Sequence, residues 1–202
     1  MSCTDLDSLD IQKITFENTI EKDLQSALKN LDMPELVTCD LLNGKKQLRL
    51  KIKGTLVTRG INTKETQWGS IHTIGLELSD QSMEIMNELA DLITTIPQYD
   101  ENWEMKNMFF KGKWYPKLKI DKDNKNRYVA QTSPKMYPKK PNEDLVKGTE
   151  VEIETEVGAW FNLSEDSKKA GIYFSFNKIH FQIDEEEAPQ QPTPKRLKKE
   201  KV

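Results

Sequence analysis

Cysteine and histidine are scarce in this chain, and their positions limit its chemistry. The cysteines are Cys3 and Cys39, which form no CxxC pair, and the histidines are His72 and His180. These spacings support neither a disulfide framework nor a zinc site. No apolar run in the sequence approaches the roughly 20 residues of a membrane span, and the acidic start MSCTDLDSLD is unlike a signal peptide. We expect a soluble, intracellular protein without a metal or membrane partner.

The short motifs of common enzyme classes are also missing. The sequence has no GxxxxGK[ST] phosphate loop, no GxGxxG, no HExxH and no GxSxG. The paired carboxylates of a nuclease metal site would have to come from Asp121 and Asp123 or from the glutamate-rich strand 149–157. The alternatives are a turn for the first pair and a solvated strand face for the second. We therefore expect a protein that is not an enzyme and that needs no cofactor.

What the chain does have is segregated charge. Its formal net charge is -3, yet residues 105–147 carry twelve Lys and Arg against four Asp and Glu, together with six of the sixteen aromatic residues. The two-residue period of a strand divides residues 109–120 into two faces. The first face carries Phe109, Lys111, Lys113, Tyr115, Lys117 and Lys119, and the second carries Phe110, Trp114, Leu118 and Ile120.

Lysines between flat rings are suited to single-stranded nucleic acid, because the ammonium groups neutralise phosphates while the rings stack on bases. The alternative is an ordinary solvated basic face above a core that contains the aromatic residues. Residues 134–141 continue the pattern as a proline-rich, basic loop that contains Tyr137, and we interpret it as a binding loop.

We expect one folded domain, residues 43–183, flanked by polar ends. Residues 1–42 carry nine acidic residues against three lysines, and an apolar stripe from Phe16 to Leu31 predicts one helix that stops before Pro34. This stripe packs on the domain or serves self-association. Residues 184–202 contain nothing that builds a core and are predicted to be disordered.

Two strands and a second helix are predicted between residues 48 and 97. Residues 48–53 alternate cleanly, with Leu48, Leu50 and Ile52 on one face and Arg49, Lys51 and Lys53 on the other. Residues 59–68 are predicted to form a polar hairpin loop, in which Trp68 is either a local packing residue or an exposed stacking platform. The next strand places His72 on the same face as Ile74, Leu76 and Leu78, and a helix follows from Asp80, its expected N-cap, to Ile96.

The last two predicted strands differ in charge. Residues 149–157 turn Val151, Ile153 and Val157 inward and four glutamates outward, namely Glu150, Glu152, Glu154 and Glu156. Because phosphates avoid such a face, we expect the binding surface on the opposite side. The final strand, up to Ile183, changes phase and predicts a β-bulge near Asn177 and Lys178.

The C-terminal residues have the form of a nuclear-import signal. Lys195, Arg196, Lys198 and Lys199 follow two prolines. A solubilising tail or a non-specific DNA contact is the alternative. The signal predicts location in the nucleus, which is the host nucleus if the protein is viral.

The order of these features resembles the single-stranded DNA-binding proteins of large DNA viruses and phages. The resemblance covers residues 45–183 and is carried by the basic-aromatic stretch 109–120, the strand 148–157, Trp160 and the strand 171–179. It implies an OB-fold, a small, partly open antiparallel β-barrel, here mainly β with a capping helix and an N-terminal helix. The basic tail departs from the acidic tail of many bacterial and phage members, which puts partner docking by the tail in doubt.

The resulting hypothesis is a protein that binds and coats single-stranded DNA, largely independently of sequence, during replication or recombination. It implies single-stranded DNA as partner, with replication proteins and self-association on DNA as further possibilities. The candidates for base stacking are Trp68, Phe109, Trp114, Tyr115, Tyr128 and Tyr137. The candidates for phosphate binding are Arg49, Lys51, Lys53, Lys111, Lys113, Lys117, Lys119, Arg127, Lys135, Lys139 and Lys140. The alternatives are a nuclear protein-interaction factor of replication or transcription, and an RNA-binding protein of the same fold.

Overall fold

The computed structural model describes residues 2–29, 35–67, 69–118, 129–131 and 145–181. The helices are α1 (Ile20–Ala27) and α2 (Asp80–Asp91), with 3-10 turns at Leu6–Ser8, Ile11–Lys13 and Leu92–Thr95. The strands are β1 (Thr4–Asp5), β2 (Ile14–Phe16), β3 (Glu35–Asn43), β4 (Lys46–Gln47), β5 (Arg49–Leu56), β6 (Asn62–Thr66), β7 (Gly69–Thr73), β8 (Leu76–Glu77), β9 (Trp103–Met105), β10 (Phe109–Phe110), β11 (Lys113–Trp114), β12 (Lys117–Leu118), β13 (Val129–Gln131), β14 (Glu150–Ser164) and β15 (Ser167–Phe181).

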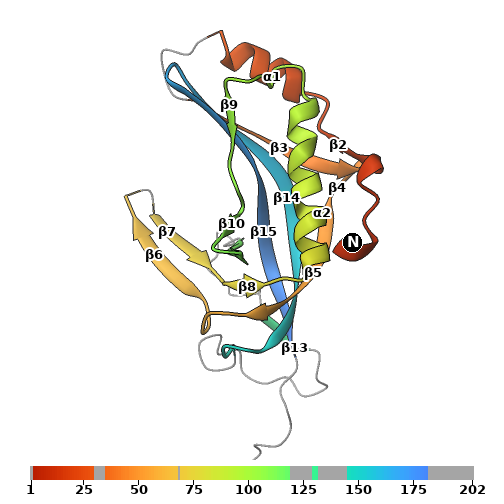
Figure 1. Cartoon of the computed structure of the whole chain (residues 1–202), viewed down its shortest axis with the longest axis vertical. Helices are drawn as coiled ribbons and strands as arrows, with labels where there is room; N and C mark the ends of the chain where they lie inside the picture. The colour runs from red at the N-terminus through yellow and green to blue at the C-terminus, as the bar shows by residue number, and fades with distance from the viewer. Residues whose placement is uncertain (1, 30–34, 68, 119–128, 132–144, 182–202) are drawn as a thin grey trace, which may run out of the picture.

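Two long strands organise the molecule. β14 and β15 contain 15 residues each and form one antiparallel hairpin, the central pair of Figure 1. On its side away from β15, β14 pairs with β5 along its first half and with β3 along its second half, both antiparallel. On its side away from β14, β15 pairs in parallel with β9, β12 and β13.

The fold is mainly β, with an open sheet and one main helix. β8 pairs with both β5 and β11, and β7 pairs with both β6 and β12. Only Ile74 and Gly75 separate β7 from β8. This continuous stretch therefore connects β5, the neighbour of β14, with β12, the neighbour of β15. The β6–β7 hairpin projects away from the central pair (Figure 1).

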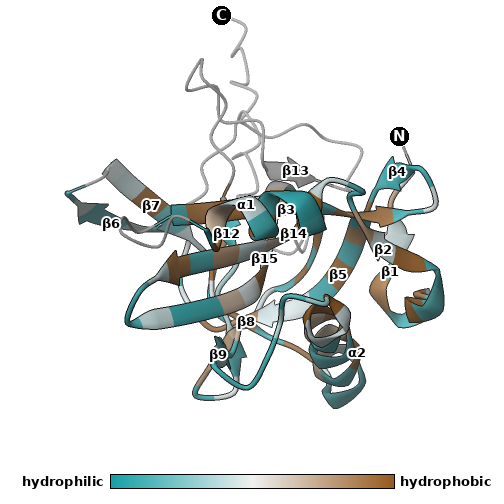
Figure 2. Ribbon diagram, turned by 90° about the horizontal axis from the view of Figure 1, so that it is seen from above, coloured by the Kyte–Doolittle hydropathy of each residue, from teal (hydrophilic) through white to brown (hydrophobic). Residues whose placement is uncertain are grey.

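The core follows from alternation along the strands. Leu50, Ile52 and Ile153 are fully buried, while the charged residues between them face outward. β5 is therefore banded brown and teal in Figure 2. The helix α2 buries Met86 and Leu89 in the same core, and its N-cap is Ser79, whose Oγ accepts from Ser82 N, rather than the predicted Asp80.

The N-terminal residues belong to this core. Leu6, Ile14 and Leu24 are buried in the same cluster as residues of β14 and β15, β1 pairs with β5, and β3 runs through residue 42. β3 therefore continues from residue 42 to residue 43, and N-terminal residues share the core of the long strands. The apolar stripe packs on the domain through Ile20 and Leu24, which is the first of the two roles that the sequence left open.

Three local predictions differ from the structure. The N-terminal helix, expected from Phe16 to Leu31, is limited to α1, because Phe16 lies in β2 and pairs with Leu41. The second helix ends at Asp91 and continues as a 3-10 turn to Thr95. The expected loop 59–68 contains β6. The predicted bulge is confirmed, because the β14–β15 register shifts at Glu154 and Thr155, where Lys178 and Phe176 are the partners and Asn177 is left over.

Candidate nucleic-acid interface

A tight hairpin presents the exposed aromatic residues. β10 and β11 pair through Phe109 with Trp114 and Phe110 with Lys113, so only Lys111 and Gly112 remain for the turn. Both have positive φ, 51° and 71°, as two-residue hairpin turns with mirror-image geometry require. The chain therefore reverses at residue 111, and the alternation read along residues 109–119 does not continue through the turn.

This reversal exchanges the roles of the two phenylalanines. Phe110, expected in the core, is 64% exposed, whereas Phe109 is partly buried against the core. The ring of Phe110 lies 6.4 Å from the ring of Tyr115 at an interplanar angle of 63°, and Tyr115 is 37% exposed. The exposed aromatic pair is therefore Phe110 and Tyr115. Gly112 is the sequence signal from which this turn could have been predicted, because glycine adopts positive φ without steric cost.

Trp114 was wrongly assigned to base stacking. It is only 2% exposed, and its ring meets Phe174 edge-on with centroids 5.1 Å apart. The cause is its register: Trp114 pairs with Leu76, which is itself fully buried. Trp114 is a core residue that anchors the hairpin.

Three lysines lie on this hairpin or close to it in the sequence. The Nζ of Lys111 lies 5.4 Å from the centroid of Phe110, a cation–π distance. Lys113 forms an ion pair with Glu77 of β8. Lys117 is exposed, and the ion pairs of the described residues include neither Lys117 nor Lys111. Below, "hairpin surface" means Phe110, Lys111, Lys113, Tyr115 and Lys117.

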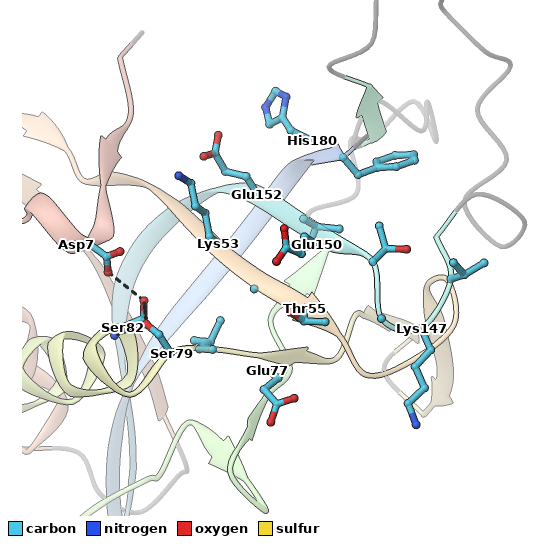
Figure 3. A pocket seen from close by; sticks show the side chains of 17 residues that line it. Asp7, Lys53, Thr55, Glu77, Ser79, Ser82, Lys147, Glu150, Glu152 and His180 are labelled. Atoms are coloured by element: carbon cyan, nitrogen blue, oxygen red, sulfur yellow. Dashed lines mark hydrogen bonds between the residues drawn. The ribbon is translucent and has the colours of Figure 1, made fainter. Parts of the chain in front are cut away.

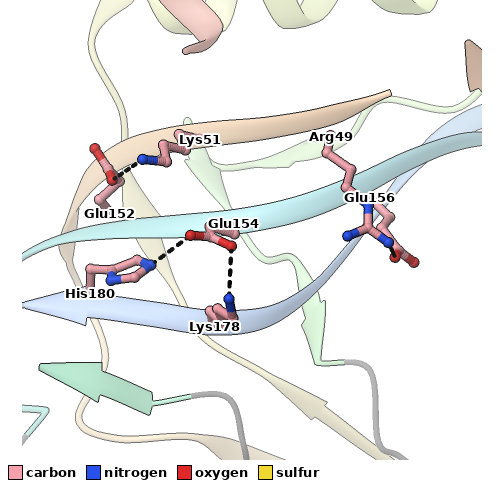
Figure 4. Close-up of polar contacts among 7 residues, drawn as sticks. All are labelled: Arg49, Lys51, Glu152, Glu154, Glu156, Lys178 and His180. Atoms are coloured by element: carbon pink, nitrogen blue, oxygen red, sulfur yellow. Dashed lines mark hydrogen bonds and ion pairs between the residues drawn. The ribbon is translucent and has the colours of Figure 1, made fainter. Parts of the chain in front are cut away.

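The basic face of β5 is neutralised by the glutamates of β14. The two strands pair so that Arg49, Lys51 and Lys53 stand opposite Glu156, Glu154 and Glu152. Arg49 bonds Glu156 at 2.7 Å, and Lys51 lies 3.8 Å from Glu152 (Figure 4). The expectation that these cations and the glutamates lie on opposite surfaces is therefore wrong, and Arg49 and Lys51 already have carboxylate partners. Lys53 is exposed and faces Glu152 only through the register.

Glu154 has two partners on β15. Its Oε1 lies 2.9 Å from His180 Nε2, and its Oε2 lies 3.5 Å from Lys178 Nζ. Burial raises the pKa of Glu154, but the hydrogen bond with His180 and the charge of Lys178 outweigh it, so the pKa lies below its ordinary value. β5, β14 and β15 thus carry a nearly balanced ladder of charges.

A separate cleft of about 1150 Å³ opens beside the N-terminus of α2 (Figure 3). Lys53, Lys147 and His180 line it together with the carboxylates Asp7, Glu77, Glu150 and Glu152. Asp7 accepts a hydrogen bond from Ser82 at 3.1 Å. Because acidic groups outnumber basic ones, the cleft is less suited to phosphates than the hairpin surface. The residues that line the cleft include neither exposed ring of that surface.

Several candidates lie outside the described residues. These are Trp68, Lys119, Arg127, Tyr128, Lys135, Tyr137, Lys139 and Lys140, and the import residues Lys195, Arg196, Lys198 and Lys199. Of the sequence candidates, the structure brings together Tyr115, Lys111 and Lys113, and it adds Phe110.

Within the described part of the chain, no three His, Cys, Asp or Glu side chains are grouped to hold a metal ion. None of the helices there has the length and apolarity needed to cross a membrane. No protein-family model matches the sequence, and no curated protein is significantly similar to it.

Proposed function

We propose that this protein binds and coats single-stranded DNA, largely independently of base sequence, through the hairpin surface. The observation that carries the proposal is the exposed aromatic pair Phe110 and Tyr115. Lys111 and Lys113 lie on the β10–β11 hairpin with Phe110, and Lys117 follows Tyr115 by two residues at the start of β12. A Phe that is 64% exposed forgoes burial, which is worth about 1.5–3 kcal/mol for a side chain of this size. Stacking by a base would cover it.

The free energy of DNA binding would come from two sources, base stacking on the aromatic rings and phosphate neutralisation by the lysines. A base stacked on an aromatic side chain contributes about 1–3 kcal/mol, whatever the base. Each lysine that neutralises a phosphate releases a counterion and steepens the salt dependence of binding. Lys111 and Lys117 are the best placed for this, since Lys113 shares its charge with Glu77.

We also propose that the sheet is an OB-fold-like, partly open barrel. The support is the order of pairing: β5 with β8, the β7–β8 stretch with β11 and β12, β12 with β15, β15 with β14, and β14 again with β5. With β7–β8 counted as one segment and β11–β12 as another, these strands make five segments, which is the number in an OB-fold. Among the described residues, β12 joins β15 through two residue pairs, Lys117 with Ser175 and Leu118 with Phe176.

The resemblance to viral and phage single-stranded DNA-binding proteins also suggests a cellular role, a location and partners. A non-enzymatic role in DNA replication or recombination follows from it, in the host nucleus if the protein is viral. Replication proteins and further copies of this chain on DNA are the partners that it implies.

Fluorescence anisotropy tests the proposal with a labelled dT oligonucleotide, its duplex counterpart and an rU oligonucleotide, each over a salt series. We expect tight, salt-dependent binding of dT and much weaker duplex binding. Tyr115→Ala and Phe110→Ala should weaken dT binding, whereas Leu36→Ala, which removes an apolar side chain that is 65% exposed, should not.

The other outcomes identify the alternatives. Stronger binding of rU than of dT would indicate an RNA-binding protein. Absence of binding to all three probes at low salt would refute the proposal and leave a protein partner for the hairpin surface.

A further inference from the structure

Gly75 lies against the ring of Tyr115, one of the two exposed aromatic side chains. It is buried between β7 and β8, and its neighbours Ile74 and Leu76 point into the core. A Cβ at this position would lie 2.8 Å from Cε1 of Tyr115, 2.8 Å from Cγ2 of Thr58 and 2.9 Å from Cγ2 of Val57. Real Cβ atoms do not approach heavy atoms so closely, so a side chain here would displace one of the three.

The backbone conformation does not explain this glycine. Gly75 is absent from the positive-φ residues, which include Gly44, Gly60 and Gly112. Its role is therefore to leave space, in the way that glycine permits close approach to a backbone.

The backbone of Gly75 is also held in place from below. Its N–H donates to Oγ1 of Thr58 at 3.0 Å, and its carbonyl accepts from the N–H of Val57 at 2.9 Å. The ring of Tyr115 thus packs against the hydrogen-bonded backbone of Gly75, next to the Cγ2 methyl groups of Thr58 and Val57. The ring of Phe110 contacts the Tyr115 ring from the hairpin.

We infer that Gly75 is a positioning residue, which sets the ring of Tyr115 at the height and angle needed for a base to stack on it. This inference rests on the proposed function. A fixed ring loses little conformational entropy when a base covers it, so pre-organisation adds to affinity. Thr58 acts with Gly75, because its methyl group bounds the same space and its hydroxyl holds the glycine N–H.

The test is a set of Gly75→Ala variants measured by dT anisotropy. Since loss of one stacked base corresponds to roughly 5- to 150-fold in affinity, we expect Gly75→Ala to weaken dT binding by a large part of the loss seen in Tyr115→Ala, with an unchanged salt slope. In the Tyr115→Ala background, Gly75→Ala should have no further effect. Multiplying effects, or wild-type affinity in Gly75→Ala, would overturn the inference.

A rescue and a matched control separate positioning from general damage. Thr58→Ser removes the methyl group that the new Cβ meets and keeps the hydroxyl, so Gly75→Ala/Thr58→Ser should recover part of the lost affinity. Gly54→Ala is the control, because its Cβ would meet Leu78 Cδ2 at 2.9 Å, away from Tyr115. Equal loss of dT affinity in Gly54→Ala and Gly75→Ala, or no recovery in the double variant, would contradict the role.

One readout does not depend on DNA. The aromatic NMR signals of Tyr115 should move in Gly75→Ala and stay in place in Gly54→Ala. If wild-type protein fails to bind dT while these signals behave as expected, the proposed function fails and the positioning of the ring stands. Unmoved signals in Gly75→Ala would refute the positioning itself.

Discussion

Replacing Arg49 should destabilise the protein and leave the salt dependence of DNA binding unchanged. Its Nη2 bonds Oε1 of Glu156 at 2.7 Å, and the two side chains are 31% and 14% exposed. Exposed ion pairs contribute about 0.2–1 kcal/mol, whereas breaking a fully buried pair costs about 3–5 kcal/mol. For this intermediate burial we expect a loss of about 2 kcal/mol for Arg49→Met.

Urea denaturation of Arg49→Met, Glu156→Gln and the double variant measures the coupling between the two side chains. The cycle is needed because Glu156 has a further interaction, so its single variant removes more than the ion pair. We expect a coupling of about 1–2 kcal/mol. A phosphate contact would instead appear in the DNA assay, where its loss lowers the salt slope by about one. The reasoning is refuted if Arg49→Met lowers the salt slope as much as Lys117→Met and leaves stability unchanged.

Three further predictions concern buried groups. Because the pKa of Glu154 lies below its ordinary 4.5, its contribution to stability is present above that value and is lost as pH falls through the folded pKa; Glu154→Gln should flatten the loss of stability as pH falls below 4.5, and an unchanged acid profile would count against this. Thr155 is 2% exposed, and its Oγ1 has no hydrogen-bond partner among the described residues, so Thr155→Val should raise stability by about 1–2 kcal/mol in urea denaturation, where a loss would contradict the assignment. Burial raises the pKa of Cys39 to about 12, and Cys3 is less buried, so a thiol reagent at about pH 8 should label Cys3 in the native protein and Cys39 only after unfolding; equal rates would be inconsistent with the fold.

Alternation along single strands was predictable from the sequence. Leu50 and Ile52 are buried and Lys51 faces outward, as residues 48–53 indicated, and the glutamates of residues 150–156 face outward as expected. The bulge beside Asn177 was also predictable, because two apolar runs of opposite phase cannot both face one core without an extra residue.

Register between distant strands was not predictable. Arg49 and Glu156 are 107 positions apart, and nothing local states that β5 and β14 pair. The sequence therefore suggested two separate charged surfaces where the structure has one balanced ladder. In the hairpin, reading Lys111 and Gly112 as strand instead of turn moved Phe110 to the wrong face.

The central claim is that single-stranded DNA contacts the hairpin surface, and photo-crosslinking to an oligonucleotide that contains 4-thio-dT tests it most directly, with the modified residues identified by mass spectrometry. The account predicts crosslinks to Phe110 and Tyr115 in the wild-type protein and fewer crosslinks at Tyr115 in Gly75→Ala. Crosslinks confined to β5 and β14, or to the cleft beside α2, would contradict it.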